Sequence, residues 1–276
     1  DYMSKGYVPL REQYDNSVSH ALEYYIADFA LSRFAEALGK KKDAEMFYKR
    51  SLGYKHYYSK EFGTFRPILP DGTFYSPFNP RQGENFEPNP GFHEGSAWNY
   101  SFYVPHDVYG LAKLMGGKNP FIKKLQMVFD EGLYDPANEP DIAYAHLFSY
   151  FRGEEWRTQK ETQRLLDKYF TTKPNGIPGN DDTGTMSAWA IFNMIGFYPD
   201  CPGLPEYTLT TPVFNKVTIR LDPKWYKEKE LVIESNRTQP GTLYINKVLL
   251  NGKKFNQYRI THDELVHSQR ILFDLK

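Results

Sequence analysis

Apolar residues recur every three or four positions through most of the first 200 or so residues. Val18, Leu22 and Ile26 follow this spacing, which gathers side chains on one face of an α-helix. Gly39 follows, and glycine commonly ends helices. Further segments with the same period are bounded by Gly or Pro signals and predict helices at residues 44–58, 108–115, 120–131, 140–151, 155–170 and 183–195. Residues 61–93 carry many prolines and predict a long loop, of the kind that often lines a site.

The period changes after residue 203. Short β-rich runs predict strands at residues 208–211, 217–221, 231–234, 243–250 and 255–260. Asn251 and Gly252 predict the turn of a hairpin between the last two runs. The order of elements indicates an α+β chain with a helical domain at 1–203 and a C-terminal antiparallel β segment at 204–276. Because such a segment has open edges, we expect its partner sheet in a portion of the protein that precedes this chain.

Composition narrows the class of protein. The chain has 276 residues with 34 basic and 34 acidic side chains, so no bulk charge favours binding to nucleic acid or an anionic membrane. The lone Cys201 excludes an internal disulfide framework, and no apolar run approaches the roughly 20 residues of a membrane helix. The chain begins Asp1-Tyr2-Met3, from which we expect a piece of a longer protein. Aromatic residues make up 17% of the chain, which suits both a ring-rich core and a carbohydrate site.

The segment from Gly179 to Trp189 carries the strongest chemical signal. Asn180, Asp181 and Asp182 stand in a row before an apolar helical run. Capping of the helix needs only one such acceptor, although capping remains an alternative for all three residues. The helix dipole and free amides keep nearby carboxylates ionised, which suits a general base or a cation ligand.

A second carboxyl lies among aromatic residues, in the segment 91–100. If a helix begins near Gly95, Glu94 and Trp98 lie one turn apart on the same face. Partial desolvation by the ring raises the pKa of a carboxyl and suits a proton donor, while the helix N-terminus acts in the opposite direction. A surface Glu beside a packing Trp is the alternative. The segment is not a zinc motif, because Ala97 stands where the second His would be.

These segments closely resemble glycoside hydrolase family 92, a family of calcium-dependent, exo-acting α-mannosidases. The resemblance extends over nearly the whole chain and rests on the order of several motifs. They are Glu94-Gly-Ser-Ala-Trp-Asn-Tyr, Val104-Pro-His-Asp, Leu114-Met-Gly-Gly, Asn138-Glu-Pro, Trp156-Arg-Thr-Gln, Gly179-Asn-Asp-Asp-Thr-Gly-Thr-Met-Ser-Ala-Trp and Gly196-Phe-Tyr-Pro.

The resemblance implies a fold and a mechanism. It implies an N-terminal β-sandwich and the front half of an (α/α)6 toroid outside this chain, which would hold the back half. It also implies inverting hydrolysis of mannose-containing glycans. Glu94 matches the family's general acid, and the pair Asp181 and Asp182 matches the motif that holds the general base. The choice between the two aspartates stays open.

The resemblance also implies a calcium ion at the sugar-binding subsite. Asn138 and Glu139 offer the hard oxygen ligands that calcium requires, although capping of a helix that begins at Pro140 is an equal alternative. We expect Trp98, Trp156 and Asn180 to contact substrate. The pattern departs from the family at residues 129–143, where a usual insertion is short and Asp-Ile-Ala replaces Ser-His-His. This departure leaves the preferred mannosidic linkage open.

Two other classes of protein compete with a hydrolase. A non-catalytic glycan-binding or scaffold protein on the same toroid is the main alternative, but both carboxylate motifs are intact. A phosphorylase or lyase would need a basic anion pocket, and Arg66, Arg81 and Arg157 are scattered in the sequence. We therefore expect an α-mannosidase portion that is inactive alone, from a secreted, periplasmic or cell-surface protein.

Overall fold

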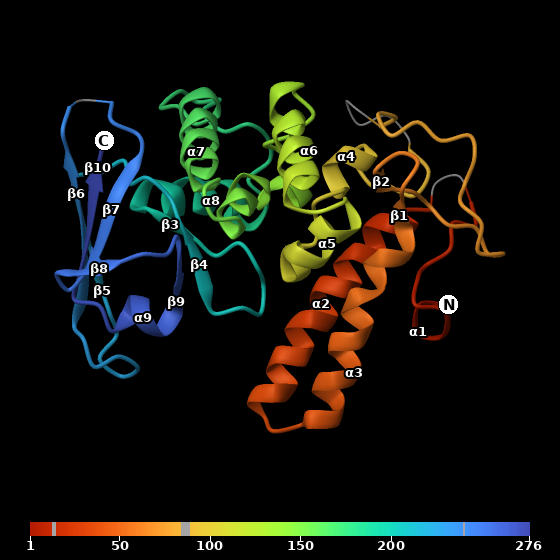
Figure 1. Ribbon diagram of the computed structural model, residues 1–276, viewed down its shortest axis with the longest axis horizontal. Helices are drawn as coiled ribbons and strands as arrows, with labels where there is room; N and C mark the ends of the chain where they lie inside the picture. Colours follow the sequence, from red (N-terminus) through yellow and green to blue (C-terminus); the bar gives the residue numbers. More distant parts are fainter. Residues whose placement is uncertain (13–14, 84–88, 240) are drawn as a thin grey trace. The chain divides into compact units, whose positions relative to one another are not determined.

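The computed structural model describes residues 1–12, 15–83, 89–239 and 241–276 (Figure 1). Residues 84–88, within the predicted loop at 61–93, therefore lie outside the described residues. The chain forms two compact units. Unit 1 comprises Asp1–Tyr144 with Cys201–Leu204, and unit 2 comprises Ala145–Asp200 with Pro205–Lys276. The contacts thus group the last long helices with the β segment, while the domain division at 203/204 stays a prediction.

Unit 1 is built around a pair of helices that lie side by side, α2 and α3 (Figure 1). Val18, Leu22 and Tyr25 line the buried face of α2, which confirms the predicted spacing. Gly39 has φ +71 and turns the chain between the two helices. The helices of unit 1 are α1 (Tyr2–Lys5), α2 (Ser17–Ala37), α3 (Lys41–Ser51), α4 (Ala97–Tyr100), α5 (Val108–Leu114) and α6 (Lys118–Asp130), with 3₁₀ segments η1 (Leu52–Tyr57), η3 (Pro105–Asp107) and η4 (Glu139–Asp141).

The long loop of unit 1 is anchored by one buried arginine. This arginine, Arg66, directly follows a short antiparallel pair of strands, β1 (Tyr58–Ser59) and β2 (Thr64–Phe65). The Arg66 guanidinium lies 5.0 Å from the ring centroid of Phe62 and 5.6 Å from those of Phe74 and Phe78. Such cation–π contacts are strongest where water is excluded, so Arg66 holds the segments at residues 62 and 74–78 together.

The helix expected at residues 140–151 is wrong in type. The structure forms two 3₁₀ segments there, η4 and η5 (Tyr144–Tyr150). The Tyr144 hydroxyl donates toward the carbonyls of Trp98 and Asn99 and accepts from the amide of Phe102. This fully buried anchor, together with buried Asp141, fixes the local backbone more strongly than helical propensity does.

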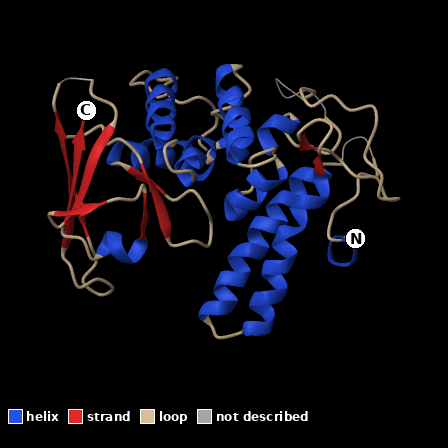
Figure 2. Cartoon of the chain, viewed as in Figure 1, coloured by secondary structure: helices blue, strands red, loops and turns tan. Residues whose placement is uncertain are grey.

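Unit 2 combines helices α7 and α8 with two β-sheets, whose strands appear in red in Figure 2. The five-stranded sheet has the order β5-β6-β10-β7-β8, and the three-stranded sheet has the order β3-β4-β9. Leu231, Ile233 and Phe273 are buried in the hydrophobic core of unit 2. The elements are α7 (Glu155–Tyr169), η6 (Asp182–Gly184), α8 (Thr185–Ile195), α9 (His262–Val266), β3 (Phe197–Tyr198), β4 (Glu206–Leu209), β5 (Lys216–Arg220), β6 (Glu230–Arg237), β7 (Ile245–Leu250), β8 (Lys253–Phe255), β9 (Arg259–Thr261) and β10 (Arg270–Leu275).

The β segment follows the prediction with two corrections. The hairpin is confirmed, since β7 pairs with β8 and Asn251 and Gly252 have φ +50 and +80. The sheet is not wholly antiparallel: β10 is antiparallel to β7 but parallel to β6, because the last strand inserts between them. The strand expected at 255–260 is divided between β8 and β9, which belong to different sheets. Among the described residues, no helix combines the length and apolar character needed to cross a membrane.

Candidate active site

The backbone at Glu94 has an unusual conformation. Its φ is +51, a left-handed value that non-glycine residues rarely adopt. Three side chains hold the main chain there: Asn138 Nδ2 donates to the Glu94 carbonyl over 2.7 Å, Tyr100 donates to the His93 carbonyl over 2.7 Å, and Ser19 Oγ accepts from the His93 amide over 2.9 Å. Strained backbone of this kind persists only where surrounding structure enforces it, and it is common at functional sites.

The Glu94 carboxyl is exposed, which corrects its predicted surroundings. Helix α4 begins after Ser96, because Ser96 and Asn99 form a capping box. Glu94 therefore lies outside the helix, and its side chain is 56% exposed with Oε1 3.5 Å from His93 Nε2. Trp98 is only 8% exposed and packs into the core of unit 1. The Glu94 carboxyl is therefore more open to solvent than the sequence predicted.

Asn138 brings a second predicted site segment to Glu94. It is buried, and its Oδ1 accepts no hydrogen bond among the described residues, while its Nδ2 binds the Glu94 carbonyl. It makes no side-chain capping bond to η4, so the capping alternative does not hold for this side chain. The next residue, Glu139, is exposed.

Glu23 was not predicted from the sequence, and its surroundings link it to Glu139. Burial raises the pKa of Glu23; the hydroxyl of Tyr103, 2.9 Å away, lowers it, and the nearby charge of Glu139 raises it further. No group of three or more His, Cys, Asp or Glu residues able to hold a metal occurs within the described ranges. Glu23 and Glu139 therefore supply at most part of a ligand shell.

In unit 2, Asp181 has the role of a helix cap. Its Oδ1 accepts from the amides of Met186 and Ser187 over 2.9 and 3.0 Å, and its Oδ2 accepts from the Ser187 hydroxyl. These bonds, the Ser187 hydroxyl foremost, lower the pKa of Asp181. The carboxylate is therefore ionised and fixed in place, as the capping alternative expects.

Asp182 differs from its neighbour. Its side chain is exposed, and its carboxylate accepts no hydrogen bond within the part of the chain that the structure describes. Its main-chain carbonyl accepts from the Thr185 hydroxyl over 2.6 Å and from the Thr185 amide. Thr183 has φ +52 and Gly184 has φ +80, so a tight turn presents Asp182 just ahead of α8. Asn180, on the other side of the pair, is also exposed.

The two acidic segments share one backbone feature. Among the described non-glycine residues, only Glu94, Thr183 and Asn251 have positive φ. Asn251 is explained by its hairpin turn, whereas the other two stand at or beside the carboxyls singled out from the sequence. Glu94 belongs to unit 1 and the aspartates to unit 2.

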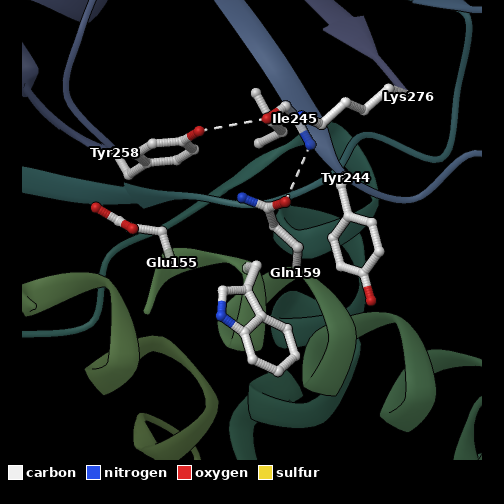
Figure 3. Close-up of a pocket in the computed structure, with 7 residues that line it drawn as sticks. Glu155, Gln159, Tyr244, Ile245, Tyr258 and Lys276 are labelled. Atoms are coloured by element: carbon white, nitrogen blue, oxygen red, sulfur yellow. Dashed lines mark hydrogen bonds between the residues drawn. The ribbon is translucent and has the colours of Figure 1, made fainter. Parts of the chain in front are cut away.

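Trp156 lines a cavity of about 430 Å³ within unit 2 (Figure 3). The ring is 39% exposed, and the Arg157 guanidinium lies 4.5 Å from its centroid. Gln159 is 2% exposed, and its Oε1 accepts from the Ile245 amide over 3.0 Å. The cavity thus combines aromatic surface with hydrogen-bonding groups. Its lining residues are Glu155, Trp156, Gln159, Tyr244, Ile245, Tyr258 and Lys276.

The helices, the β-sheets and the two acidic turns agree with the class of glycoside hydrolase that the sequence motifs suggest. The model of the glycosyl hydrolase family 92 catalytic domain matches residues 1–276. The chain therefore belongs to glycosyl hydrolase family 92, and the resemblance seen in the motifs is confirmed.

Solved structures and a curated relative agree with this assignment. A family 92 α-mannosidase from Bacteroides thetaiotaomicron, solved with mannoimidazole, has a TM-score of 0.91 and 30% identity over 100% of this chain and 38% of its own. An inverting family 92 mannosidase from the same organism has a TM-score of 0.88 and 31% identity over 100% of this chain and 39% of its own. An uncharacterized secreted glycosidase from Arthroderma benhamiae is 26% identical over an alignment of 288 positions, gaps included, that covers 95% of this chain and 37% of the relative. The chain thus spans less than two fifths of these relatives, in accord with the predicted C-terminal portion of the catalytic region.

Proposed function

We propose that the protein to which this chain belongs is an exo-acting α-mannosidase that removes mannose from glycans with inversion. The observation that carries the proposal is the family match over residues 1–276. In this chain Glu94, Asp181 and Asp182 lie at two turns with left-handed backbone conformations. The solved neighbours described as α-mannosidase and inverting mannosidase support the substrate and the stereochemistry.

Glu94 is the proposed general acid. Its carboxyl is exposed and held outside α4, so it can reach the glycosidic oxygen of a substrate and donate a proton to it. The proton is needed most when the departing alkoxide is basic.

Asp182 is the proposed general base, and Asp181 holds the turn that carries it. Three hydrogen bonds commit the Asp181 carboxylate to the start of α8, whereas the Asp182 carboxylate is open to solvent. A base must accept a proton from water, which requires an uncommitted oxygen. Inversion also requires room for that water, so the carboxyls of Glu94 and Asp182 should lie roughly 6.5–9.5 Å apart in the complete enzyme.

Calcium and the remaining architecture belong to the same proposal. A missing N-terminal β-sandwich and front half of an (α/α)6 toroid would complete the fold. Calcium takes six to eight oxygens, and Asn138 Oδ1, Glu139 and Glu23 offer hard donors in unit 1. This partial set fits the ion if water and sugar hydroxyls supply the rest. When bound, calcium would hold the mannose hydroxyls and favour a distorted ring.

The aromatic cavity of unit 2 is the proposed contact for a further part of the glycan. The exposed face of Trp156 can stack on a sugar ring, while Glu155 and Lys276 in the cavity lining offer charged partners for its hydroxyls. Asn180 is exposed beside the aspartates and can bond to a sugar hydroxyl. Trp98 is buried in unit 1, so we propose that it supports the Glu94 segment from within the core.

The alternatives are less well supported. Loss of an acidic turn would favour a non-catalytic glycan-binding protein, and both turns are present. An anion-binding lyase or phosphorylase would need uncommitted arginines, but Arg66, Arg81 and Arg157 pair with carboxylates. The relative described as secreted supports a secreted, periplasmic or cell-surface location.

The test is release of mannose by the complete protein. α-1,2-, α-1,3-, α-1,4- and α-1,6-linked mannobioses are incubated with and without a calcium chelator, and the anomer formed first is read by NMR. We expect β-mannose from at least one linkage, and we expect the 276-residue chain alone to be inactive. Binding without turnover would favour the glycan-binding alternative, and α-mannose as the first product would exclude inversion.

A further inference from the structure

Asp141 is a fully buried carboxyl in unit 1 that no step above uses. Its Oδ2 accepts from Asn99 Nδ2 over 2.8 Å and from the Asp135 amide over 2.7 Å. Its Oδ1 is buried and has no hydrogen-bond partner among the described residues. Burial raises the pKa of Asp141, but Oδ2 can accept both N–H groups whether or not Oδ1 carries a proton. An incompletely satisfied buried carboxyl is costly to the fold, which calls for a reason for its presence.

One connection from Asp141 leads to Glu94 through Asn99. The two N–H groups of Asn99 Nδ2 face Asp141 Oδ2 and the Leu133 carbonyl, 3.1 Å away. These acceptors fix the orientation of the amide and turn its oxygen toward Ser96. That oxygen accepts from the Ser96 amide over 2.8 Å and from the Ser96 hydroxyl over 2.9 Å. These two bonds therefore fix the main chain at Ser96, two residues after Glu94.

A second connection runs through Asn138. The amide of Asp141 donates to the Asn138 carbonyl over 3.1 Å, and Asn138 Nδ2 donates to the Glu94 carbonyl. Gly95 lies between the two connections: a Cβ there would meet Asn99 Oδ1 at 3.1 Å and Asn138 Nδ2 at 3.2 Å. The side chains of Asn99 and Asn138 thus hold the backbone at residues 94–96. Asn99 is bonded to the Asp141 carboxylate, whereas Asn138 is bonded to Asp141 through main-chain atoms alone.

We propose that Asp141 is a positioning residue for the proposed acid Glu94, and that its carboxylate acts through Asn99 and Ser96 to hold Glu94 at φ +51. The proposal rests on the proposed function. Removal of the Asp141 carboxyl leaves Asn99 free to rotate its amide, so the support of Ser96 is lost. Glu94 can then relax from its strained conformation, and a shift of about 1 Å in a catalytic group can cost roughly 100-fold in rate.

The test measures kcat for the complete enzyme on a mannobiose and on 4-nitrophenyl α-mannoside. Asp141→Ala should lower kcat on the mannobiose by roughly 10- to 100-fold and on the aryl substrate by less than about 3-fold. Asp141→Asn keeps an oxygen that can accept from both Asn99 and Asp135, so it should stay within about 3-fold of wild type on both. Equal losses on the two substrates for Asp141→Ala, or an Asn variant as impaired as the Ala variant, would overturn the proposal.

A matched control separates positioning from stability. Asp28 is also a buried carboxyl of unit 1, and it pairs with Arg50 and Tyr2. Asp28→Asn should lower the unfolding temperature and leave the ratio of the two kcat values unchanged. If Asp141→Ala does not fold, Ser96→Ala removes one bond of the same connection and should lower that ratio by roughly 3- to 10-fold, and an unchanged ratio would count against the proposal.

Coupling to Glu94 distinguishes this proposal from the proposed function. Asp141→Ala should have no selective effect in a Glu94→Gln background, because the acid it positions is already absent. If Glu94→Gln itself shows no leaving-group selectivity, the acid assignment fails. If Glu94→Gln is selective but the effect of Asp141→Ala simply adds to it, only the positioning role fails.

Discussion

Asn138 donates a hydrogen bond of 2.7 Å to the main-chain carbonyl of Glu94, 44 positions earlier in the chain. This bond joins two motifs that the sequence suggested for different purposes, one for acid catalysis and one for calcium. Because the bond ends on the backbone, it fixes the strained conformation of Glu94 without covering its carboxyl. Asn138 therefore supports the proposed proton donor and belongs to the proposed metal site as well.

The acid assignment predicts a selective loss of activity. In the complete enzyme, Glu94→Gln should lower kcat on mannobiose by about 10²- to 10⁴-fold and spare an aryl mannoside with a good leaving group. Steady-state kinetics on both substrates, with Glu94→Asp as a variant that retains an acid, measure the effect. Equal slowing of both substrates would show that Glu94 is not the acid.

The aspartate pair predicts two different phenotypes. Asp182→Asn should abolish turnover of both substrates alike and leave the unfolding temperature unchanged, because its carboxylate makes no contact to α8. Asp181→Asn should lower the unfolding temperature, since it weakens the bonds to the amides of Met186 and Ser187. Calorimetry and kinetics on both variants provide the measurement. If Asp181→Asn were stable but inactive while Asp182→Asn stayed active, Asp181 would be the base and Asp182 would not.

Much of the fold follows from local patterns. The spacing of Val18, Leu22 and Ile26 was sufficient to predict α2, and the pair Asn251 and Gly252 was sufficient for the hairpin. The parallel pairing of β10 with β6 could not be predicted, because it depends on which strands the returning chain finds as neighbours. The register of a sheet is decided by long-range contacts that leave no local period.

The candidate site was predictable in its chemistry and less so in its geometry. The segments around Glu94 and Asp181 could be found because carboxyls beside helix starts and rings are conspicuous. The position of Glu94 outside α4 was missed, since the Ser96 side chain rather than Gly95 decides where the helix begins. Glu23 and Asp141 were missed because their importance arises from Tyr103 and Asn99, partners distant in sequence.

The burial of His106 predicts that the free energy of unfolding falls in acid. Burial lowers the pKa of His106 to about 4, and its Nδ1 has no partner among the described residues. The unfolded state binds a proton below pH 6.5 while the folded state does not, so stability present above pH 6.5 is lost as the pH falls toward 4. The loss should reach roughly 3 kcal/mol. Unfolding of the complete protein and of His106→Gln, compared at pH 7 and 4.5, tests this, because the variant should lose less stability. Equal losses would rule out His106 as the cause.

The cavity of unit 2 predicts an effect on binding. Trp156→Ala should raise KM for an oligomannoside by roughly tenfold, equivalent to about 1.4 kcal/mol, with little change in kcat. Trp225 is a suitable control, because it is 72% exposed and stands outside the cavity lining. Trp225→Ala should leave both constants unchanged. A fall in kcat with unchanged KM for Trp156→Ala would contradict a role in holding substrate.

Calcium provides the last prediction. Asn138, Glu139 and Glu23 offer oxygen donors but too few to close a shell of six to eight ligands, so water and sugar hydroxyls must complete it. Calcium tolerates such mixed shells at about 2.3–2.6 Å, whereas magnesium dehydrates reluctantly. A chelator should therefore abolish activity reversibly, and calcium should restore it better than magnesium.

The assignment of Glu139 to that shell can be separated from general effects of charge. Glu139→Gln should weaken calcium binding by roughly tenfold or more, measured directly by calorimetry on the complete protein as well as by activity. Glu36 is an exposed carboxylate that pairs with Arg33, so Glu36→Gln removes the same charge from unit 1 and should leave calcium affinity unchanged. Full activity in excess chelator would remove calcium from the mechanism. If Glu139→Gln left the calcium dependence unaltered, calcium would keep its place in the mechanism, but its ligands would have to lie elsewhere in the protein.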